Sequence, residues 1–370
     1  MEAKKLGFGF MRLPKLDEND PASIDIEETK KMVDTFLEKG FTYFDTAWMY
    51  HSFKSENAIK ETLVDRYPRE SYTLATKLHA LFIKTKEDRD KVFEEQLKKT
   101  GVDYFDYYLL HDMREEHYKI YEELDCFNWI KEKKEQGLVK KIGFSFHDTA
   151  EFLDKVLTEH PEMEFVQLQI NYIDWESDSI QSRKCHEVAV KHGVPIIIME
   201  PVKGGTLANV PEDAGKLLKE YHPELSVPSW AIRFAASQKN VMMVLSGMSD
   251  MDQLLDNTGY MGEFEPLNEE EYEILNKVVE IIHSQIAVPC TECSYCTDGC
   301  PAQIAIPKYF ALYNKAKNIT VEDAGDKYKE LKKTAGKIED CVECGQCEGI
   351  CPQQLKVTEY LKDVKKYFEK

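Results

Sequence analysis

The chain has 370 residues, of which 42% are hydrophobic and 31% charged, and its formal net charge is −19. This length allows one large domain and a small one, each with a packed core. The negative charge argues against a nucleic-acid partner, because such binding depends on Lys and Arg that neutralise phosphates. The sequence has no apolar run of ~18 residues and no recognisable secretory leader. We therefore expect a cytoplasmic protein that does not use a membrane.

Residues 1 to about 260 alternate short apolar runs with longer amphipathic stretches. Helical periodicity occurs in four of the stretches, and Gly40, Gly137 and Gly193 stand where helix C-caps belong. The predicted helices are 26–39, 90–100, 124–136 and 179–192, and the predicted strands are 5–10, 42–45, 72–77, 107–110, 141–144, 165–169, 195–199 and 242–245. Eight strands separated by helices predict an α/β fold, a (β/α)8 TIM barrel.

An open doubly wound sheet is the alternative fold. It would require a G-x-G-x-x-G turn that leads from the first strand into a helix. The nearest match is Gly7-Phe8-Gly9, and it is followed by Phe10-Met11-Arg12, which is not a helix start.

Three consecutive predicted strands end in residues that can carry proton chemistry. Asp45 ends the second strand and Tyr50 follows five residues later, Lys77 ends the third strand, and His111 stands at the end of the fourth. Active sites of such barrels lie at this C-terminal face. A free tyrosine keeps its proton up to a pKa of about 10. A nearby Lys77 ammonium would make Tyr50 a better acid, and Asp45 would keep Lys77 charged. His111 would hydrogen-bond the carbonyl or the phenol, so the set predicts proton delivery to a carbonyl oxygen while hydride arrives at its carbon.

The segment from residue 6 to about 257 resembles an aldo-keto reductase. The resemblance is carried by the four strand-end residues and by further motifs: Leu6–Pro14, Gly143-Phe144-Ser145, Val166–Tyr172, Glu200-Pro201 with Gly204-Gly205, and Asp256-Asn257. It implies a nicotinamide coenzyme bound across the barrel mouth, without a Rossmann fold, and a small carbonyl or alcohol substrate. By resemblance Ser145 and Gln169 hold the carboxamide, Asn257 lies near the adenine, and the turn with Pro201 and Gly204 lies at the coenzyme.

The last phosphate loop departs from the pattern of many family members. Gly247 and Gln253 stand where those members place the Lys and Arg that grip the 2′-phosphate of NADP. We therefore predict that NADP is preferred over NAD by less than ~10-fold. The departure also admits FMN, since phosphate loops of this kind commonly take a single phosphate. Lys203-Gly204-Gly205 either meets phosphate through backbone N–H groups or forms a tight turn.

Two matching cysteine runs lie near the end of the chain. The pattern C-x2-C-x2-C-x3-C-P is that of bacterial ferredoxins, in which the fourth cysteine of each run ligates the other cluster. The runs contain eight of the ten cysteines: Cys290, Cys293, Cys296 and Cys300, then Cys341, Cys344, Cys347 and Cys351. Zinc prefers sets of four arranged as separated pairs, and disulfides require an oxidising compartment, so both are disfavoured. We predict two 4Fe–4S clusters, and we expect Cys126 and Cys185 to be buried thiols.

The domain prediction has three parts. Residues 1–262 form the barrel, 263–285 a helical bridge, and 286–370 a helical ferredoxin-type domain with helices over 308–317, 322–335 and 357–370. The predicted function is an iron–sulfur oxidoreductase that uses NAD(P)H, with the clusters as an electron-transfer module and an electron-transfer protein as partner. A flavin that bridges two-electron and one-electron transfer is one alternative. An electron-transfer protein whose barrel does not catalyse is the other.

Overall fold

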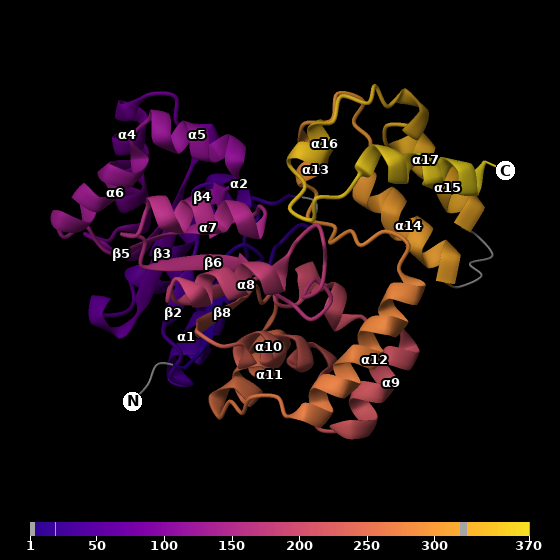
Figure 1. The fold of residues 1–370 in the computed structure, drawn as a ribbon, viewed down its shortest axis with the longest axis horizontal. Coiled ribbons are helices and arrows are strands. Elements are labelled where there is room, and N and C mark those ends of the chain that lie inside the picture. The colour runs from indigo at the N-terminus through magenta and orange to yellow at the C-terminus, as the bar shows by residue number, and fades with distance from the viewer. Residues whose placement is uncertain (1–3, 19, 319–323, 370) are drawn as a thin grey trace. The chain divides into compact units, whose positions relative to one another are not determined.

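The computed structural model describes residues 4–18, 20–318 and 324–369, and Figure 1 shows its elements. The chain forms two compact units that are interleaved along the sequence. The first contains the residues through Ser177 together with Gln181–Pro201 and Ser229–Leu267, and the second contains Asp178–Ile180, Val202–Pro228 and the residues from Asn268. The segment between residues 202 and 228 thus belongs with the C-terminal part, although it lies inside the predicted barrel segment.

Eight parallel strands close the barrel of the first unit in the order β1 to β8. Closure comes from pairing of the last strand with the first, in which Gly7 lies opposite Leu245. The strands are β1 (Leu6–Gly9), β2 (Tyr43–Asp45), β3 (Thr73–His79), β4 (Phe105–Met113), β5 (Val139–Phe146), β6 (Phe165–Gln169), β7 (Ile196–Met199) and β8 (Val241–Ser246). The predicted (β/α)8 fold is confirmed, and the open sheet is excluded by the closed strand order.

Side chains of alternate strand residues fill the barrel interior. One buried layer combines Tyr43, Ala75, Leu109 and Phe165 with residues of β7 and β8. Gly143 joins this layer without a side chain, because a Cβ there would lie 2.4 Å from the Phe165 carbonyl oxygen. Since strand side chains alternate with a period of two, the residues two positions further along point into the same space nearer the mouth.

Helices surround the strands of the barrel. The predicted glycine caps are confirmed at Gly40, Gly137 and Gly193, whose φ angles are +81°, +77° and +69°. The four predicted helices are observed as α1 (Ile26–Glu38), α4 (Lys86–Thr100), α6 (Cys126–Glu135) and α8 (Ser182–Lys191). Further helices are α2 (Tyr50–Phe53), α3 (Ser55–Ile59), α5 (Glu115–Glu123), α7 (Ala150–Glu159), α10 (Val227–Ser237) and α11 (Met251–Gly262). Short helical turns are η1 (Lys60–Val64), η2 (Arg69–Ser71) and η3 (Ala80–Phe82).

The second unit is built of helices around its own apolar core. The core includes Tyr309, Phe310, Val357 and Leu361, all 1% exposed or less. Its elements are η4 (Lys203–Ala208), α9 (Glu212–Tyr221), α12 (Glu269–Gln285), α13 (Tyr295–Asp298), α14 (Ile306–Asn318), α15 (Ala324–Thr334), η5 (Ile338–Asp340), α16 (Gln346–Gly349) and α17 (Val357–Phe368). The predicted helices correspond to α14, α15 and α17, and part of the second prediction, residues 322–323, lies outside the described residues, as does residue 370. No helix within the described ranges is long and apolar enough to cross a membrane.

The two cysteine runs repeat the same backbone. Each has left-handed residues two and four positions after its first cysteine: Glu292 and Ser294 with φ of +54° and +66°, then Glu343 and Gly345 with φ of +54° and +73°. The duplication seen in the sequence is therefore a duplication of local structure.

Candidate active site and cluster cradles

The strand side chains that point into the barrel are polar at the barrel mouth. Two positions beyond the interior layer the chain places Asp45, Lys77, His111 and Ser145 on four consecutive strands. Asp45 and Lys77 are 3% and 1% exposed. Burial of this kind holds a charged pair in a low dielectric, where its contacts matter most.

Lys77 connects the acid and the tyrosine of this set. Its Nζ donates to Asp45 Oδ1 at 2.5 Å and to the Thr46 carbonyl at 2.8 Å. The Tyr50 hydroxyl lies 3.5 Å from the same Nζ, and the ammonium lies 5.0 Å from the centre of the Tyr50 ring. The structure thus brings the first three predicted catalytic residues together.

Burial dominates the ionisation of these groups. It raises the pKa of Asp45 and lowers that of Lys77, while their mutual contact opposes both shifts. Burial also raises the pKa of Tyr50 well above its ordinary value, and the carboxylates of Asp45, Glu200 and Asp112 raise it further. Tyr50 is therefore protonated at neutral pH.

The loop that carries Tyr50 is tied down by His51. The His51 ring accepts the Leu13 N–H at Nε2 (3.1 Å) and, at Nδ1, lies 2.8 Å from the Pro21 carbonyl. These bonds fix the tautomer with the proton on Nδ1. His51 and the two residues after it all have φ between +50° and +68°. A strained turn held by a buried histidine sets the position of Tyr50.

His111 completes the predicted set across from Tyr50. The two rings are 6.0 Å apart between centroids and nearly perpendicular, at 80°. Burial, together with His79 and Lys77, holds the pKa of His111 well below its usual range, so the ring is neutral at pH 7. Its buried Nδ1 has no hydrogen-bond partner among the residues that the structure describes.

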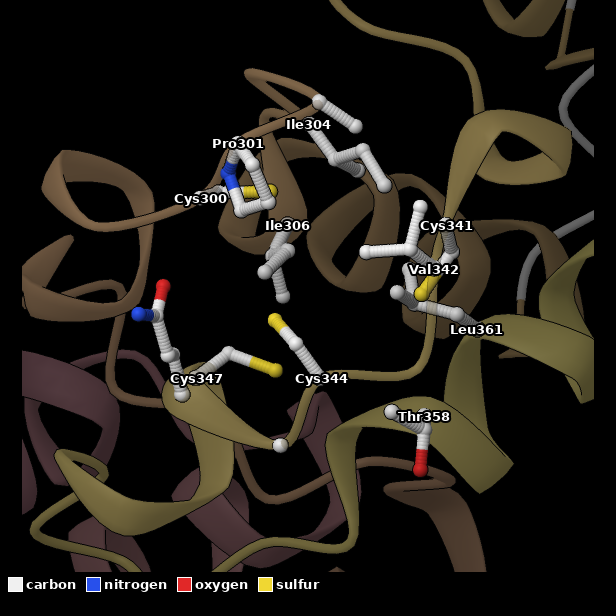
Figure 2. Close-up of a pocket in the computed structure, with 13 residues that line it drawn as sticks. Cys300, Pro301, Ile304, Ile306, Cys341, Val342, Cys344, Cys347, Thr358 and Leu361 are labelled. Carbon is white, nitrogen blue, oxygen red and sulfur yellow. The ribbon is translucent and has the colours of Figure 1, made fainter.

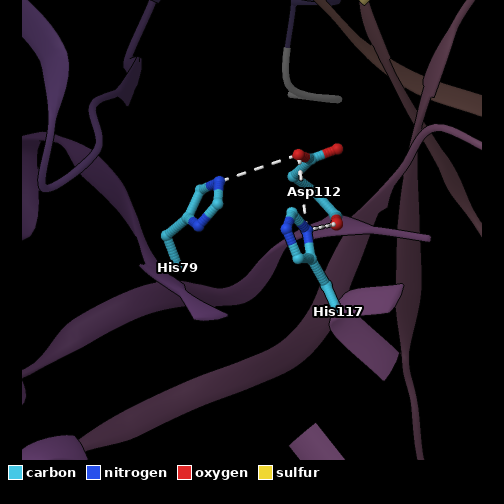
Figure 3. Close-up of side chains that lie close together, drawn as sticks. All are labelled: His79, Asp112 and His117. Carbon is cyan, nitrogen blue, oxygen red and sulfur yellow. Dashed lines mark hydrogen bonds and ion pairs between the residues drawn. The ribbon is translucent and has the colours of Figure 1, made fainter. Parts of the chain in front are cut away.

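A second cluster of ionisable groups lies beside His111 and centres on Asp112 (Figure 3). The nearest Asp112 carboxylate oxygen is 3.7 Å from His79 Nε2 and 3.4 Å from His117 Nδ1, which donates instead to the Asp112 backbone carbonyl at 2.7 Å. Two histidines and one carboxylate form a set that can bind a metal. However, Arg114 donates to the same carboxylate at 2.6 Å and already supplies its counter-charge. The cluster is therefore explained as an ion-pair network.

The residues expected at the coenzyme already have partners inside the barrel unit. Ser145 Oγ accepts the Asp112 N–H at 2.8 Å, and Gln169 Nε2 donates to Asp174 at 3.1 Å. Asn257 Nδ2 donates to Ser246 Oγ at 3.0 Å. Gln253 accepts the Ser249 N–H at 3.0 Å and so closes the start of α11. These bonds fix the side chains, and none of them provides a cation for phosphate.

Arg12 places a cation beside Gly247 that the sequence motifs did not indicate. A Cβ added to Gly247 would lie 3.1 Å from Arg12 Cβ and 3.3 Å from its Cγ, so the arginine stem packs directly over this glycine. The Ser249 hydroxyl donates to the Arg12 carbonyl at 2.9 Å. Arg12 Nη2 is buried without a hydrogen-bond partner among the described residues. An anionic group would satisfy this donor, so the residues fit a coenzyme phosphate.

Two acidic residues lie at the start of α11. Asp250 caps α11 by accepting the Gln253 N–H at 2.8 Å, and Asp252 lies in the first helical turn. Pro201 lies two residues after the end of β7, in the first unit. Gly204, with φ of +63°, belongs to η4 in the second unit, and Lys203 there is hydrogen-bonded to a side chain of the same unit, as described below.

The cysteines of the second run share one hollow with the last cysteine of the first run. Figure 2 shows the thiols of Cys300, Cys341, Cys344 and Cys347 around this hollow, whose other walls include Ile304, Ile306, Val342 and Leu361. We call it the second cradle. Four thiols in an apolar surround are a donor set that fits a 4Fe–4S cluster.

The first cradle mirrors this arrangement. Cys290, Cys293 and Cys296 line it together with Cys351, the last cysteine of the second run. The structure therefore groups the thiols in the crossed pattern that the spacing predicts. Burial raises the pKa of Cys290 to about 11 and that of Cys296 to about 12. Since clusters bind thiolates, assembly must be coupled to loss of these protons.

The two remaining cysteines lie apart from the cradles. Cys126 begins α6 and Cys185 lies in α8, and both are buried. Burial raises the pKa of each thiol to about 12, so both are unreactive.

Comparisons with known proteins match both parts of the chain. The aldo/keto reductase family model matches residues 5–280, and the model of a 4Fe-4S dicluster domain matches residues 289–355. An uncharacterized oxidoreductase of Bacillus subtilis, YqkF, is 24% identical over 291 residues, which is 70% of this chain and 87% of the relative. The methylglyoxal reductase DkgA of Yersinia pestis is 31% identical over 126 residues, 33% of this chain and 42% of the relative.

Solved structures show the same fold. The holo form of the aldo-keto reductase AKR11C1 of Bacillus halodurans has a TM-score of 0.58 at 24% identity, covering 74% of this chain and 91% of that one. An aldo-keto reductase of Klebsiella pneumoniae in complex with NADPH has a TM-score of 0.58 at 16% identity, covering 75% and 96%. The flavin alternative gains no support from these proteins. The chain belongs to the aldo/keto reductase family, as an oxidoreductase that also carries a 4Fe-4S dicluster domain.

Proposed function

We propose that the barrel reduces a small carbonyl compound, or oxidises the corresponding alcohol, with NAD(P)H, and that Tyr50, Lys77, Asp45 and His111 carry the proton chemistry. The observation that carries the proposal is the position of Lys77 Nζ, 2.5 Å from Asp45 and 3.5 Å from the Tyr50 hydroxyl. A buried ammonium between a carboxylate and a phenol has few purposes besides stabilising negative charge on the phenol oxygen.

Each residue has a defined role. The coenzyme, when bound, supplies or accepts hydride. Tyr50 holds the proton that goes to the carbonyl oxygen, and Lys77 stabilises the phenolate that remains. Asp45 holds Lys77 in place through the 2.5 Å contact. Neutral His111 orients the carbonyl oxygen by a hydrogen bond from its ring. The raised pKa of Tyr50 keeps it protonated at neutral pH, so its proton is available for the carbonyl oxygen.

The coenzyme would be held by the predicted set and by Arg12. Ser145 and Gln169 would meet the carboxamide, Asn257 the adenine, and Pro201 and Gly204 would line its path, while Arg12 would meet a phosphate beside Gly247 and Gln253. The NADPH complex of the Klebsiella pneumoniae enzyme supports a nicotinamide coenzyme for this fold. Gly247 and Gln253 themselves offer no cation for a 2′-phosphate, so we keep the proposal that NADP is preferred over NAD by less than ~10-fold.

The eight cysteines of the two runs would hold two 4Fe–4S clusters, one in each cradle. A cluster carries one electron at a time, so the domain suits exchange with an electron-transfer protein. The barrel and the clusters together make an iron–sulfur oxidoreductase, which we place in the reducing cytoplasm because exposed clusters and free thiols persist there.

Replacement of Tyr50 by Phe tests the catalytic proposal. The change removes only the hydroxyl, so coenzyme oxidation with a panel of small aldehydes and ketones should fall by ~10²-fold or more. Coenzyme binding, measured by fluorescence titration, should be unchanged. Tyr104→Phe is the matched control, because its hydroxyl accepts only from Lys140 in the described structure, at 3.2 Å, near the opposite end of β4. Near-normal turnover by Tyr50→Phe would exclude the mechanism.

A further inference from the structure

Two lysines in the described part of the chain are buried, Lys77 and Lys203, at 1% and 3% exposure. The first belongs to the proposed catalytic set. Lys203 opens η4, four residues after the end of β7, and has φ of +48°, an uncommon backbone conformation for lysine. A buried ammonium on a residue with a constrained backbone is energetically costly, so it indicates a function.

Lys203 reaches the first cradle. Its Nζ donates to Gln353 Oε1 at 2.6 Å, and both residues belong to the second unit. Gln353 is 4% exposed and follows Cys351-Pro352, and all three of these residues line the first cradle. The ammonium is therefore one hydrogen bond away from a residue in the wall of this cradle.

The second cradle differs at the matching position. Ala302 follows Cys300-Pro301 in the first run, as Gln353 follows Cys351-Pro352 in the second, and it lines the second cradle. Alanine has no side-chain acceptor, so this position cannot tether a lysine in the same way. The two cradles are alike in backbone and cysteines, and they differ here in charge.

We infer that Lys203 is a tuning residue of the first cradle: through Gln353 it places a positive charge that raises the reduction potential of the cluster bound there above that of the other cluster. The inference rests on the proposed cluster ligation and does not depend on the reaction of the barrel.

Electrostatics gives the direction of the effect. Four thiolates make the site anionic, and reduction adds one more negative charge to the cluster. A nearby buried cation stabilises the reduced form more than the oxidised form, and the low dielectric of the surroundings strengthens the attraction. Electrons reaching the domain would then collect on the first-cradle cluster, beside the loop that leads back to β7.

The test is an EPR-monitored redox titration of the anaerobically purified full-length protein with both clusters bound. Lys203→Met keeps the length of the stem and removes the charge. The reduction equilibrium constant of the first-cradle cluster should fall by about tenfold, which is about 59 mV for one electron. Lys203→Arg should restore the potential. Gln353→Glu keeps the lysine partner and adds a negative charge, so it should also lower the potential.

Lys219→Met is the matched control. Lys219 lies in the same 202–228 segment as Lys203, and its exposed ammonium donates to the Leu225 carbonyl at 2.7 Å. Lys219→Met should shift the reduction potential of neither cluster. The inference is overturned if Lys203→Met and Gln353→Glu leave the first-cradle potential unchanged at full iron content, or if they shift both clusters equally. Iron content separates these outcomes from failure of the ligation itself: if Cys351→Ala leaves both clusters intact, the proposed ligation is wrong.

Discussion

The buried pair of Asp45 and Lys77 makes a strong prediction about stability. Asp45→Asn keeps the shape of the side chain and removes its charge. The Lys77 ammonium, 1% exposed, then keeps the Thr46 carbonyl and the Tyr50 hydroxyl as its hydrogen-bond partners among the described residues. Breaking a buried pair in this way costs about 3–5 kcal/mol. The exposed pair of Lys60 and Asp65, whose atoms are 2.6 Å apart, provides the comparison, and Asp65→Asn should cost less than about 1 kcal/mol.

The effect should depend on pH in a defined direction. Burial already lowers the pKa of Lys77, and Asp45 opposes that shift, so Asp45→Asn should lower the pKa further. The unfolded chain then binds more protons than the folded chain at alkaline pH, and stability rises with pH wherever this holds. The variant should therefore recover stability as the pH approaches the unfolded lysine pKa of about 10.4. Asp65→Asn should show no such recovery.

A double-mutant cycle identifies the pair as the cause. Lys77→Met alone leaves Asp45 buried and unpaired, whereas Asp45→Asn with Lys77→Met removes both charges. Urea unfolding of each variant, followed by circular dichroism of the barrel helices, gives the four free energies. We expect the double variant to be destabilised by less than the sum of the single ones, with a coupling of about 3 kcal/mol. Additive losses, or equal losses for the buried and exposed pairs, would refute the reasoning.

The remaining predictions concern the bound groups. Arg12→Met should raise the Kd of NADPH by about tenfold and that of NADH by less, because one charge-assisted bond to phosphate is lost. Fluorescence titration of both coenzymes measures the two Kd values. Equal losses of affinity would place Arg12 at a phosphate that both coenzymes share. Cys300→Ala should disturb the EPR signal of the cluster held mainly by the second run, and a change confined to the first-run cluster would reverse the assignment. Cys126→Ser and Cys185→Ser should leave about eight irons per chain, two clusters of four, and a loss of iron would assign one of them as a ligand.

The barrel could be predicted because its signals are local. A strand such as Phe165–Gln169 is a short apolar run between turn residues, and its observed bounds equal the predicted ones. The glycine caps are equally local, since only the residue at the end of a helix decides the left-handed turn. The fourth strand was predicted too short, at residues 107–110, because charged residues follow it. In the structure β4 continues to Met113 through a bulge in which Asp112 has φ of +56°.

The missed residues depend on contacts between distant parts of the chain. Arg12 follows β1 and packs over Gly247, which follows β8. These two strands meet only when the barrel closes, and no periodicity connects the two positions. Lys203 and Gln353 are 150 positions apart. The one available signal was the missing cation itself: a phosphate loop without Lys or Arg implies a cation from elsewhere. Lys203, a nearby basic residue in the sequence, does not answer it, because its ammonium is hydrogen-bonded to Gln353.

The two buried lysines share a physical purpose. A chain with a formal charge of −19 opposes the arrival of electrons, and a buried ammonium is expensive to maintain, so such cations belong where negative charge appears during reduction. In the proposed function Lys77 lies at the phenol that would become a phenolate, and Lys203 lies at the wall of a cradle whose cluster would gain an electron. The anionic Asp45 holds the Lys77 ammonium in place before the charge develops, and the neutral amide of Gln353 does the same for Lys203. This preorganisation makes the positive charge effective, because no side chain has to move when the electron or hydride arrives.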